Sequence, residues 1–307
     1  MLAFSTYATY IVMSFMMLVM IFMMLPQAQV SAERINEVLS TEPSIKGGVV
    51  EKSEEEGTVE FRNVSFRYKD STEDELSGIN FKVEKGKTLA IIGATGSGKT
   101  TLVNLIPRTY DATQGEVLVD GVNVKDYTQK ALLDKIGFVT QKATLFSGTI
   151  KDNVFFGESR TDYDDADLSE ALEASQASEF VDKLPEKSEH KIAQLGRNVS
   201  GGQKQRISIA RALARKPEIL VFDDSFSALD YRTDARLRKE LNEKFKGVTK
   251  IIVAQRVSTI RHADEILVLD RGETVGRGTH DELIESCGIY REIAASQTGS
   301  QKEEKRV

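Results

Sequence analysis

The chain has 307 residues, of which 29% are charged and 40% hydrophobic, and its net charge is −6 at pH 7. This length suits one large domain or two modest ones, and the charge argues against nucleic acid as the main partner, because neutralising phosphates requires a concentrated basic surface. Cys287 is the only cysteine, so an intramolecular disulfide is excluded and a reducing compartment is indicated.

An apolar segment opens the chain: no charged side chain precedes Glu33, and all seven methionines lie in the first 24 residues. A helix of about 24 residues over 2–25 would be about 36 Å long, enough to cross a bilayer. A cleaved signal peptide is the alternative, because residues 30–32 resemble a cleavage site, but the apolar run is too long and no basic segment precedes it. We therefore predict a transmembrane helix over residues 1–26, ending at Pro26.

One face of this helix carries a stripe of large flexible side chains, namely Tyr10, Met13, Met17, Met20 and Met24. Packing against other helices is the favoured interpretation, and a lining for varied apolar substrates is the alternative. A single helix cannot enclose a path across a membrane. Further spans are therefore expected from partner chains, or from a longer protein of which this chain is the C-terminal part.

The segment after Pro26 is expected to join the membrane helix to a folded domain. Residues 28–39 have the pattern of an amphipathic helix, which ends at Thr41-Glu42-Pro43, and an acidic linker follows. We predict a junction over 27–57, a folded domain over 58–296 and a disordered tail over 297–307. The tail is charged at its end and has no apolar period.

Residues 88–92 have the pattern of a buried strand and run directly into a loop that fits G-x-x-x-x-G-K-[ST]. Its glycines let backbone N–H groups wrap phosphates, and the helix that starts near Lys99 directs its positive end at them. In such a loop the lysine reaches the β- and γ-phosphates, and the Thr100 hydroxyl binds Mg²⁺. The sequence therefore predicts a nucleoside triphosphate site formed by Gly93, Ala94, Thr95, Gly96, Ser97, Gly98, Lys99, Thr100 and Thr101.

A second apolar run, residues 219–222, ends in Asp223 and Asp224. Acidic turns often follow strands, so this run would be weak evidence by itself. Beside a phosphate loop, however, a carboxylate at the end of a central strand gives Mg²⁺ its second anchor. Asp223 is therefore predicted to be a metal ligand together with Thr100.

Between these two segments, residues 199–206 read Val-Ser-Gly-Gly-Gln-Lys-Gln-Arg. With this motif the chain resembles the ABC transporter ATPases, whose signature contains Ser-Gly-Gly-Gln. The resemblance covers essentially the whole chain, because residues 26–43 are similar to the junction after the last helix of an exporter. It implies an α/β P-loop NTPase fold with mostly parallel strands around the phosphate loop, an antiparallel β subdomain at its start and a helical subdomain near 150–215.

Other motifs of the family occur in the family's order. Tyr68 matches the aromatic residue on which adenine stacks, and Gln141 matches the residue that links Mg²⁺ and the attacking water to the membrane domain. Residues 227–230 match the D-loop, and residues 145–150 are typical of exporters rather than importers. In the family two ATPase domains pack head to tail, so the resemblance implies that the ATP of a second chain is covered by Ser200, Gly201, Gly202 and Gln203.

Two positions that serve hydrolysis in the family differ in this chain. The residue after the Mg²⁺ aspartate is usually the Glu that polarises the attacking water, and the shorter side chain of Asp224 withdraws that carboxylate by about 1.5 Å. The family's His beside the γ-phosphate is replaced by Gln255, which can donate a hydrogen bond but has no titratable proton. Gln194 also replaces a Glu that precedes the signature and touches the membrane domain.

The binding residues are thus kept, whereas two of the three candidate catalytic residues, Asp224 and Gln255 but not Gln141, depart from the family. This pattern resembles the weak-site subunit of a heterodimeric exporter. A homodimer with two slow sites is the alternative.

The resemblance therefore implies an ATP-hydrolysing exporter subunit that uses ATP and Mg²⁺. It would lie in the cell membrane, with its ATPase domain in the cytoplasm. Expected partners are a second half-transporter and a transported small molecule, lipid or peptide, but no nucleic acid. The alternatives are a soluble ABC-type ATPase that acts as a mechanical switch on a macromolecule, and a truncated fragment without a function. Whether the protein needs detergent distinguishes the exporter from the soluble ATPase.

Overall fold

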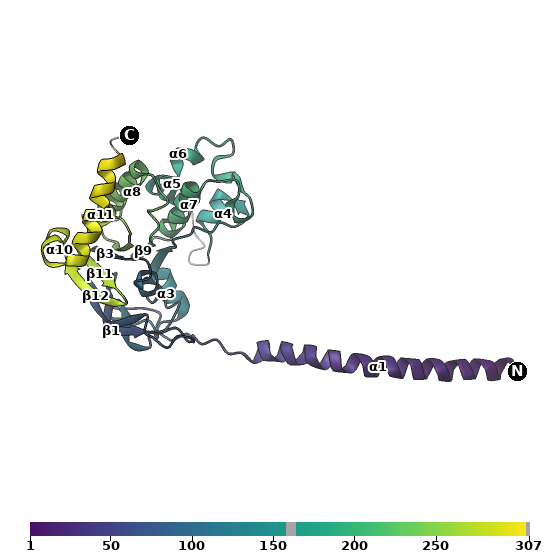
Figure 1. The fold of residues 1–307 in the computed structure, drawn as a ribbon. Coiled ribbons are helices and arrows are strands. Elements are labelled where there is room, and N and C mark those ends of the chain that lie inside the picture. The colour runs from purple at the N-terminus through teal and green to yellow at the C-terminus, as the bar shows by residue number, and fades with distance from the viewer. Residues whose placement is uncertain (158–163, 305–307) are drawn as a thin grey trace. The chain divides into compact units, whose positions relative to one another are not determined.

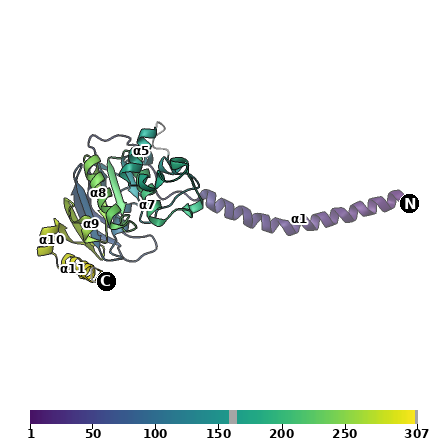
Figure 2. The ribbon, with the colours of Figure 1, turned by 90° about the horizontal axis from the view of Figure 1, so that it is seen from above.

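The computed structural model describes residues 1–157 and 164–304, with the backbone alone from residue 298. The chain divides into two units, Met1–Lys46 and Gly47–Val307, and each is described by itself. The first unit contains one helix, α1 (Leu2–Ser40) (Figures 1 and 2). An 18-residue window of α1 has a mean hydropathy of 2.3, and none of it is buried, so by length and composition this helix could cross a membrane.

Helix α1 continues through Pro26, which corrects the prediction of a helix that ends at this residue and a separate helix over 28–39. A proline inside a helix removes one backbone hydrogen bond, but it does not have to end the helix when good helix formers flank it. Ala28, Ala32 and Glu33 are such residues. The apolar part and the amphipathic part are therefore one element of 39 residues.

The second unit is built on a six-stranded sheet whose strands are ordered β12-β11-β3-β10-β9-β6. All neighbours in this sheet are parallel except β11 and β12. The central strands β3, β9 and β10 are almost fully buried and mostly apolar, as expected for strands that are covered on both faces. The strands are β3 (Thr88–Gly93), β6 (Ile136–Val139), β9 (Ile219–Asp223), β10 (Thr249–Val253), β11 (Glu265–Asp270) and β12 (Glu273–Gly278).

A second, antiparallel sheet has the order β2-β1-β4-β5. Its inward residues form one hydrophobic cluster with α2 and with residues from one face of the larger sheet. The strands are β1 (Val59–Phe66), β2 (Leu76–Val83), β4 (Gln114–Val119) and β5 (Val122–Asn123). The predicted antiparallel subdomain at the start of the folded domain is confirmed.

The unit also contains helices, and those of the predicted helical subdomain gather together in Figure 1. They are α4 (Ile150–Val154), α5 (Asp165–Ala174), α6 (Ser178–Val181) and α7 (Gly201–Ala214), with a small ladder of β7 (Gly148–Thr149) and β8 (Lys191–Ile192) and the 3-10 turns η1 (Lys187–Glu189) and η2 (Gln194–Gly196). The other helices are α2 (Lys99–Asn104), α3 (Gln129–Lys135), α8 (Tyr231–Lys244), α9 (Val257–Ile260), α10 (His280–Ser286) and α11 (Gly288–Glu304).

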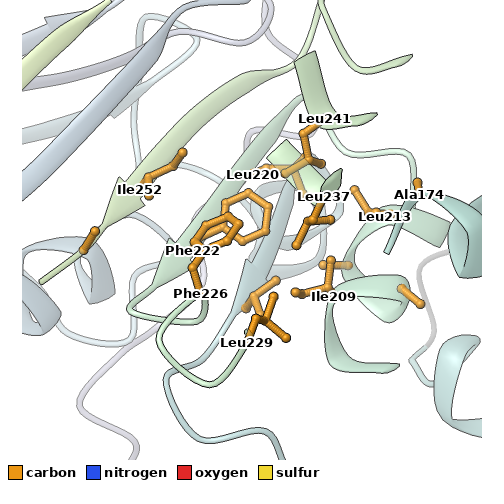
Figure 3. Packing of buried hydrophobic residues seen from close by; sticks show 14 of the residues in the cluster. Ala174, Ile209, Leu213, Leu220, Phe222, Phe226, Leu229, Leu237, Leu241 and Ile252 are labelled. Atoms are coloured by element: carbon orange, nitrogen blue, oxygen red, sulfur yellow. The ribbon is translucent and has the colours of Figure 1, made fainter. Parts of the chain in front are cut away.

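The helices are joined to the large sheet by a hydrophobic core around Phe222 (Figure 3). This ring is fully buried on β9, and its centroid lies 5.0 Å from that of Phe226. Leu213 comes from α7 and Leu237 from α8, and both belong to the same buried cluster. Strand β9 is thereby held in place by helices from two different parts of the chain.

The acidic linker is bound to the folded unit rather than free. Val50 forms an isolated parallel bridge with Tyr127, and the Glu56 carboxylate lies 2.6 Å from the Lys85 ammonium. The folded unit therefore begins at Gly47, earlier than the predicted boundary at residue 58. Hydrogen bonds to Tyr127 and Asp126 hold this segment, and its composition alone does not reveal them.

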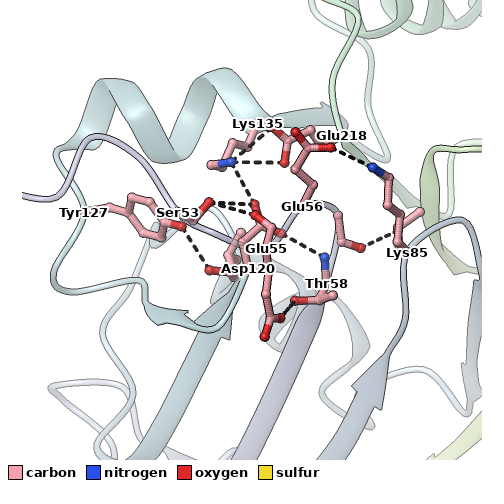
Figure 4. Close-up of polar contacts among 12 residues, drawn as sticks. Ser53, Glu55, Glu56, Thr58, Lys85, Asp120, Tyr127, Lys135 and Glu218 are labelled. Carbon is pink, nitrogen blue, oxygen red and sulfur yellow. Dashed lines mark hydrogen bonds and ion pairs between the residues drawn. The ribbon is translucent and has the colours of Figure 1, made fainter.

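Asp120 is the centre of the polar contacts that fasten the linker (Figure 4). Its buried carboxylate accepts a hydrogen bond of 2.8 Å from the Thr58 N–H and pairs with the Lys135 ammonium at 2.8 Å. Lys135 also contacts Glu218, which precedes β9, at 3.0 Å. Burial raises the pKa of Glu218. One lysine thus connects the start of the unit to the strand that carries the aspartates.

The C-terminal segment differs from the predicted disordered tail over 297–307. Helix α11 continues to Glu304, and residues 305–307 lie outside the described part of the chain. Tyr290 and Ile293 place the start of this helix against the core. Gln297, the first residue of the predicted tail, is hydrogen-bonded to the main chain at Gln255 and Val257. The composition of this segment predicts disorder, because composition alone does not reveal contacts with distant parts of the sequence.

We expect Phe222→Ala to lower the free energy of unfolding by about 3–5 kcal/mol, because it removes a buried ring and leaves a cavity. Denaturant titration of the protein in detergent measures this loss. Phe156→Ala is the matched control, since Phe156 is 49% exposed and, among the described residues, its ring stacks on Phe146 and lies below the Arg211 guanidinium. Its cost should be about 1 kcal/mol or less. Equal losses from the two substitutions would contradict the assignment of the core.

Candidate functional site

The glycine-rich loop closes around the lysine that follows it. Strand β3 ends at Gly93 and α2 begins at Lys99, whose Nζ donates to the backbone oxygens of Gly93 at 2.9 Å and Ala94 at 2.6 Å. It also donates to Ser97 Oγ at 3.3 Å. Burial lowers the pKa of Lys99, although the two nearby aspartates raise it in part. The loop therefore holds the Lys99 ammonium in a partly desolvated position.

Two of the loop's glycines are required by the backbone. Gly98 has a φ of +92°, and a Cβ there would lie 2.8 Å from Leu76. A Cβ on Gly93 would lie 2.1 Å from the backbone oxygen of Leu269. The φ of Gly98 would strain any larger residue, and a side chain at Gly93 would collide with the backbone of β11. These contacts explain two of the glycines that the sequence motif prescribes.

A cavity of about 180 Å³ lies at the carboxyl ends of β3, β9 and β10. It brings together residues that are far apart in the sequence but that the motifs predicted to act at one site. Its lining residues are Glu75, Thr95, Gly96, Gly98, Lys99, Thr100, Thr101, Gln141, Asp223, Asp224, Val253 and Gln255. Glu75 and Val253 were missed from the sequence, because neither lies in a motif.

Asp223 and Thr100 form the part of the cavity that fits Mg²⁺. The Thr100 hydroxyl donates to Asp223 Oδ1 at 3.0 Å, and burial raises the pKa of Asp223. A hydroxyl and a carboxylate are the hard oxygen ligands that Mg²⁺ prefers. Within residues 1–157 and 164–304 no group of three or more His, Cys, Asp or Glu could hold a metal ion. Mg²⁺ that is held by one carboxylate and by phosphates does not need such a group.

The three candidate catalytic residues meet at one atom. Asp224 Oδ2 accepts hydrogen bonds from Gln141 Nε2 at 3.1 Å and from Gln255 Nε2 at 2.7 Å. Burial raises the pKa of Asp224, and the two amide donors offset part of that rise. Gln141 follows β6 and Gln255 follows β10, so the two amides approach the carboxylate from both sides of β9. The juxtaposition that the motifs imply is therefore present.

The backbone of Asp224 is in the left-handed region, with a φ of +46°. The Asp224 N–H donates to the Val253 backbone oxygen at 3.0 Å, and Ser227 Oγ donates to the Asp224 backbone oxygen at 2.7 Å. Asp and Asn enter this region more readily than other residues that carry a side chain. The turn therefore directs the carboxylate into the cavity instead of along the strand.

Tyr68 lies beside the phosphate loop but does not line the cavity. Its hydroxyl is 3.0 Å from Thr101 Oγ1, and its ring packs edge-on against Phe66 and Tyr110, with centroids at 4.8 Å and 5.4 Å. The side chain is 37% exposed and can present a ring to a base. Tyr110 is a second exposed aromatic residue at this place, and no sequence motif marks it.

The signature residues lie away from this cavity in the same chain. Ser200 caps α7, because its Oγ accepts from the Gln203 N–H at 3.3 Å, while Gln203 Oε1 accepts from the Ser200 N–H at 2.8 Å. A side chain at Gly201 would meet nothing within 4 Å, and Gly202 also begins this helix. None of the residues from Ser200 to Gln203 lines the cavity at Lys99. Their predicted contact with the ATP of a second chain stays a prediction.

Helix α7 is nonetheless connected to the segment that contains Gln141. Gln205 is buried and donates to the Thr140 backbone oxygen at 3.1 Å. Arg211 donates to the Thr144 backbone oxygen at 3.1 Å and lies over the rings of Phe146 and Phe156. Movement of the signature helix would therefore displace residues next to the cavity.

A phosphate loop between a parallel strand and a helix, with a carboxylate at the end of a nearby strand, places the second unit among the P-loop nucleoside triphosphatases. Residues 76–227 match the family model described as ABC transporter. This match, which covers about half of the chain, identifies the second unit as an ABC transporter ATP-binding domain.

Comparison with individual proteins extends the similarity to the N-terminal helix. The chain is 43% identical to an uncharacterized ABC transporter ATP-binding protein of Mycobacterium tuberculosis (97% of this chain, 51% of the relative). It is 41% identical to an ATP-dependent lipid A-core flippase of Haemophilus influenzae (85% and 44%). A bacterial Atm1-family ABC exporter with ATP bound superimposes with a TM-score of 0.83 at 33% identity (92% and 50%). The chain thus spans about half the length of the relatives it matches.

We expect Asp224→Asn to raise the melting temperature of the nucleotide-free protein at pH 8. The folded state raises the pKa of this carboxyl, so its charged form opposes folding, and the penalty disappears as the pH falls through the raised folded value. Asn keeps an acceptor for both glutamines and tolerates the same backbone. Differential scanning calorimetry from pH 4 to pH 8 should show the gain only toward the upper end.

Asp264→Asn is the control of opposite sign. Burial by itself would raise the pKa of Asp264, but the Thr88 N–H and the Lys87 ammonium outweigh burial and hold the pKa below its usual value. Its charged form therefore supports folding above the unfolded pKa, and that support is lost as the pH falls through the folded value. A loss of stability from Asp224→Asn at pH 8 that matches the loss from Asp264→Asn would contradict the prediction.

Proposed function

We propose that the chain is the ATP-binding and ATP-hydrolysing subunit of an ABC exporter, and that it couples ATP turnover to efflux of a substrate across the cell membrane. The observation that carries this proposal is one alignment, to the exporter with ATP bound, which covers 92% of the chain with a TM-score of 0.83. The unit would lie on the cytoplasmic side, where ATP is available. The transported substrate would be a small molecule, a lipid or a peptide.

A second half-transporter would complete the site. Within this chain, none of the residues from Ser200 to Gln203 lines the cavity at Lys99, so this chain's own signature does not cover it. In the proposed assembly, Ser200 to Gln203 of each chain would cover the ATP bound to the other chain. The positive end of α7, capped by Ser200, would then face the γ-phosphate. A single helix as apolar as α1 also requires further spans to enclose a path.

The residues of the cavity divide into holding and reacting groups. Lys99 would hold the β- and γ-phosphates, and Thr100 and Asp223, with Gln141 beside them, would hold Mg²⁺. The metal ion would neutralise charge that develops on the transferred phosphoryl group. Asp224 would orient the attacking water, and Gln255 would donate a hydrogen bond toward the γ-phosphate.

The same geometry supports a slow site and a heterodimer. Asp224 is one methylene shorter than the usual Glu, and a misplacement of about 1 Å can cost about 10²-fold in rate. Gln255 has no titratable proton, and losing the contact that a His would make in the transition state would cost about 10²–10³-fold. The two losses need not multiply, because Asp224 and Gln255 are hydrogen-bonded to each other and act on the same phosphate. Binding residues without full hydrolysis residues suit the weak-site subunit of an asymmetric pair.

We expect the full chain to bind Mg·ATP but to hydrolyse it slowly, and Asp224→Glu with Gln255→His to raise its turnover by about 10²-fold or more. Both substitutions return groups that reach the γ-phosphate and its water, and neither changes the loop around Lys99. Calorimetry gives the affinity and phosphate release gives the turnover. Lys99→Ala in the doubly substituted chain is the control that should abolish the gain. Rapid turnover by the unsubstituted chain would contradict the weak-site proposal.

We expect Ser200→Ala to lower ATP turnover of the assembled transporter by about 10²-fold, comparable with the loss of one transition-state donor, and Asp224→Asn to lower it far less. In the asymmetric assembly the signature of this chain covers the active ATP of the partner, whereas Asp224 serves the slow site. Phosphate release in membranes that contain the native partner measures both effects. Equal and severe losses would favour a symmetric homodimer, in which every site uses both residues.

A further inference from the structure

The side chain of Gln297 on α11 bridges two main-chain groups beside the cavity. Its Nε2 donates to the backbone oxygen of Gln255 at 2.7 Å, and its Oε1 accepts from the N–H of Val257 at 2.8 Å. One primary amide is thus bonded on both sides of Arg256. Both bonds have the ordinary length of strong amide hydrogen bonds.

This bridge satisfies a group that has no local partner. Val257 is the first residue of α9, and its N-cap, Arg256, provides no side-chain hydrogen bond. The guanidinium of Arg256 instead lies 5.0 Å above the ring of Tyr231. Without Gln297 the Val257 N–H would lose its acceptor inside the fold. The backbone oxygen of Gln255, whose side chain lines the cavity, would lose its hydrogen-bond donor.

Helix α11 is fixed to the core just before it reaches the loop. Tyr290 is fully buried and its hydroxyl lies 2.7 Å from His280 Nδ1, while Ile293 and Ala294 pack against the main hydrophobic cluster. Positions 290, 293, 294 and 297 have the spacing of one helical face. The bridge therefore joins the loop to a helix that is itself anchored, so the position of Gln297 is set by packing.

We propose that Gln297 is a positioning residue for the loop at residues 255–257, which it holds so that the side chain at 255 reaches Asp224 and the γ-phosphate. Three hydrogen bonds support this role: the two bonds of Gln297 to the main chain, and the 2.7 Å bond from Gln255 Nε2 to Asp224 Oδ2. The proposal rests on the proposed function, because it assigns to Gln297 the placement of a group in that ATP site.

Two substitutions separate the bonds of Gln297 from its packing. Gln297→Glu keeps an acceptor for the Val257 N–H but turns a carboxylate oxygen toward the Gln255 backbone oxygen. When this carboxyl is protonated, its O–H can donate to that oxygen, so both bonds return at low pH. Gln297→Leu keeps a similar volume and loses both bonds at every pH. Ala295→Glu, at an exposed position of the same helix, adds the same charge without touching the bridge.

Hydrogen exchange of the full chain in detergent, with Mg·ATP bound, tests the bridge directly. At pH 8 we expect exchange of the amides in residues 255–257 to rise about fivefold in Gln297→Glu and in Gln297→Leu, the effect of losing one ordinary hydrogen bond. As the pH falls through the pKa of the introduced carboxyl, which is ordinarily about 4.3, the first variant should return toward the parent measured at the same pH, and the second should not. ATP affinity should stay within about twofold of the parent.

Turnover in the Asp224→Glu/Gln255→His background tests whether the bridge supports hydrolysis. Gln297 bonds the main chain at position 255, so the bridge does not depend on which side chain stands there. There Gln297→Glu should lower kcat about tenfold at pH 8 with KM within about twofold, and Ala295→Glu should change neither. Unchanged exchange at 255–257 in both Gln297 variants would overturn the proposal. A parallel loss of kcat, affinity and melting temperature would also overturn it in favour of a purely structural role. A background without turnover, together with the expected exchange, would count against the proposed function and not against the bridge.

Discussion

The parallel register of β10 with its two neighbours is the constraint on which the site depends. Val253 lies opposite Ile91 on one side and opposite Asp223 on the other, so the glycine-rich loop, the aspartates and Gln255 leave the sheet at the same edge. A shift by one residue would displace these groups by about 3.3 Å and exchange the two faces of a strand that is buried on both. Bonds as short as those to Asp224 could not form after such a shift.

This edge concentrates charge that the buried core alone would disfavour. Burial raises the pKa values of the Asp223 and Asp224 carboxyls and lowers the pKa of the Lys99 ammonium beside them. All three groups are therefore partly removed from water, which disfavours their charged forms. The lysine is meanwhile occupied by backbone oxygens, and Asp224 by two neutral amides. The surplus negative charge is what a divalent cation would relieve, while the freed lysine would meet phosphate oxygens.

Sequence patterns predicted the parts of the molecule that local chemistry determines. The glycine loop, the strand that ends at Asp223 and the α/β class followed from motifs in which the spacing itself performs the function. Three features did not follow: helix α1 continues through Pro26, residues 47–57 are bound to the folded unit, and Gln297 is bonded beside the cavity. Each depends on a partner far away in the chain or on the sum of many helical bonds, and neither is visible in a short window of sequence.

The left-handed backbone at Asp224 has a consequence for how this position can change over time. The residue at position 224 must fit a left-handed main chain with a φ of +46° as well as supply a carboxylate. Asn and Gly meet the first requirement without the second, whereas Val, Ile and Thr fail it because branching at Cβ makes the left-handed region costly. Chemistry can thus be lost here by single steps that leave the fold intact. A chain whose partner supplies the hydrolytic power would be free to take such steps.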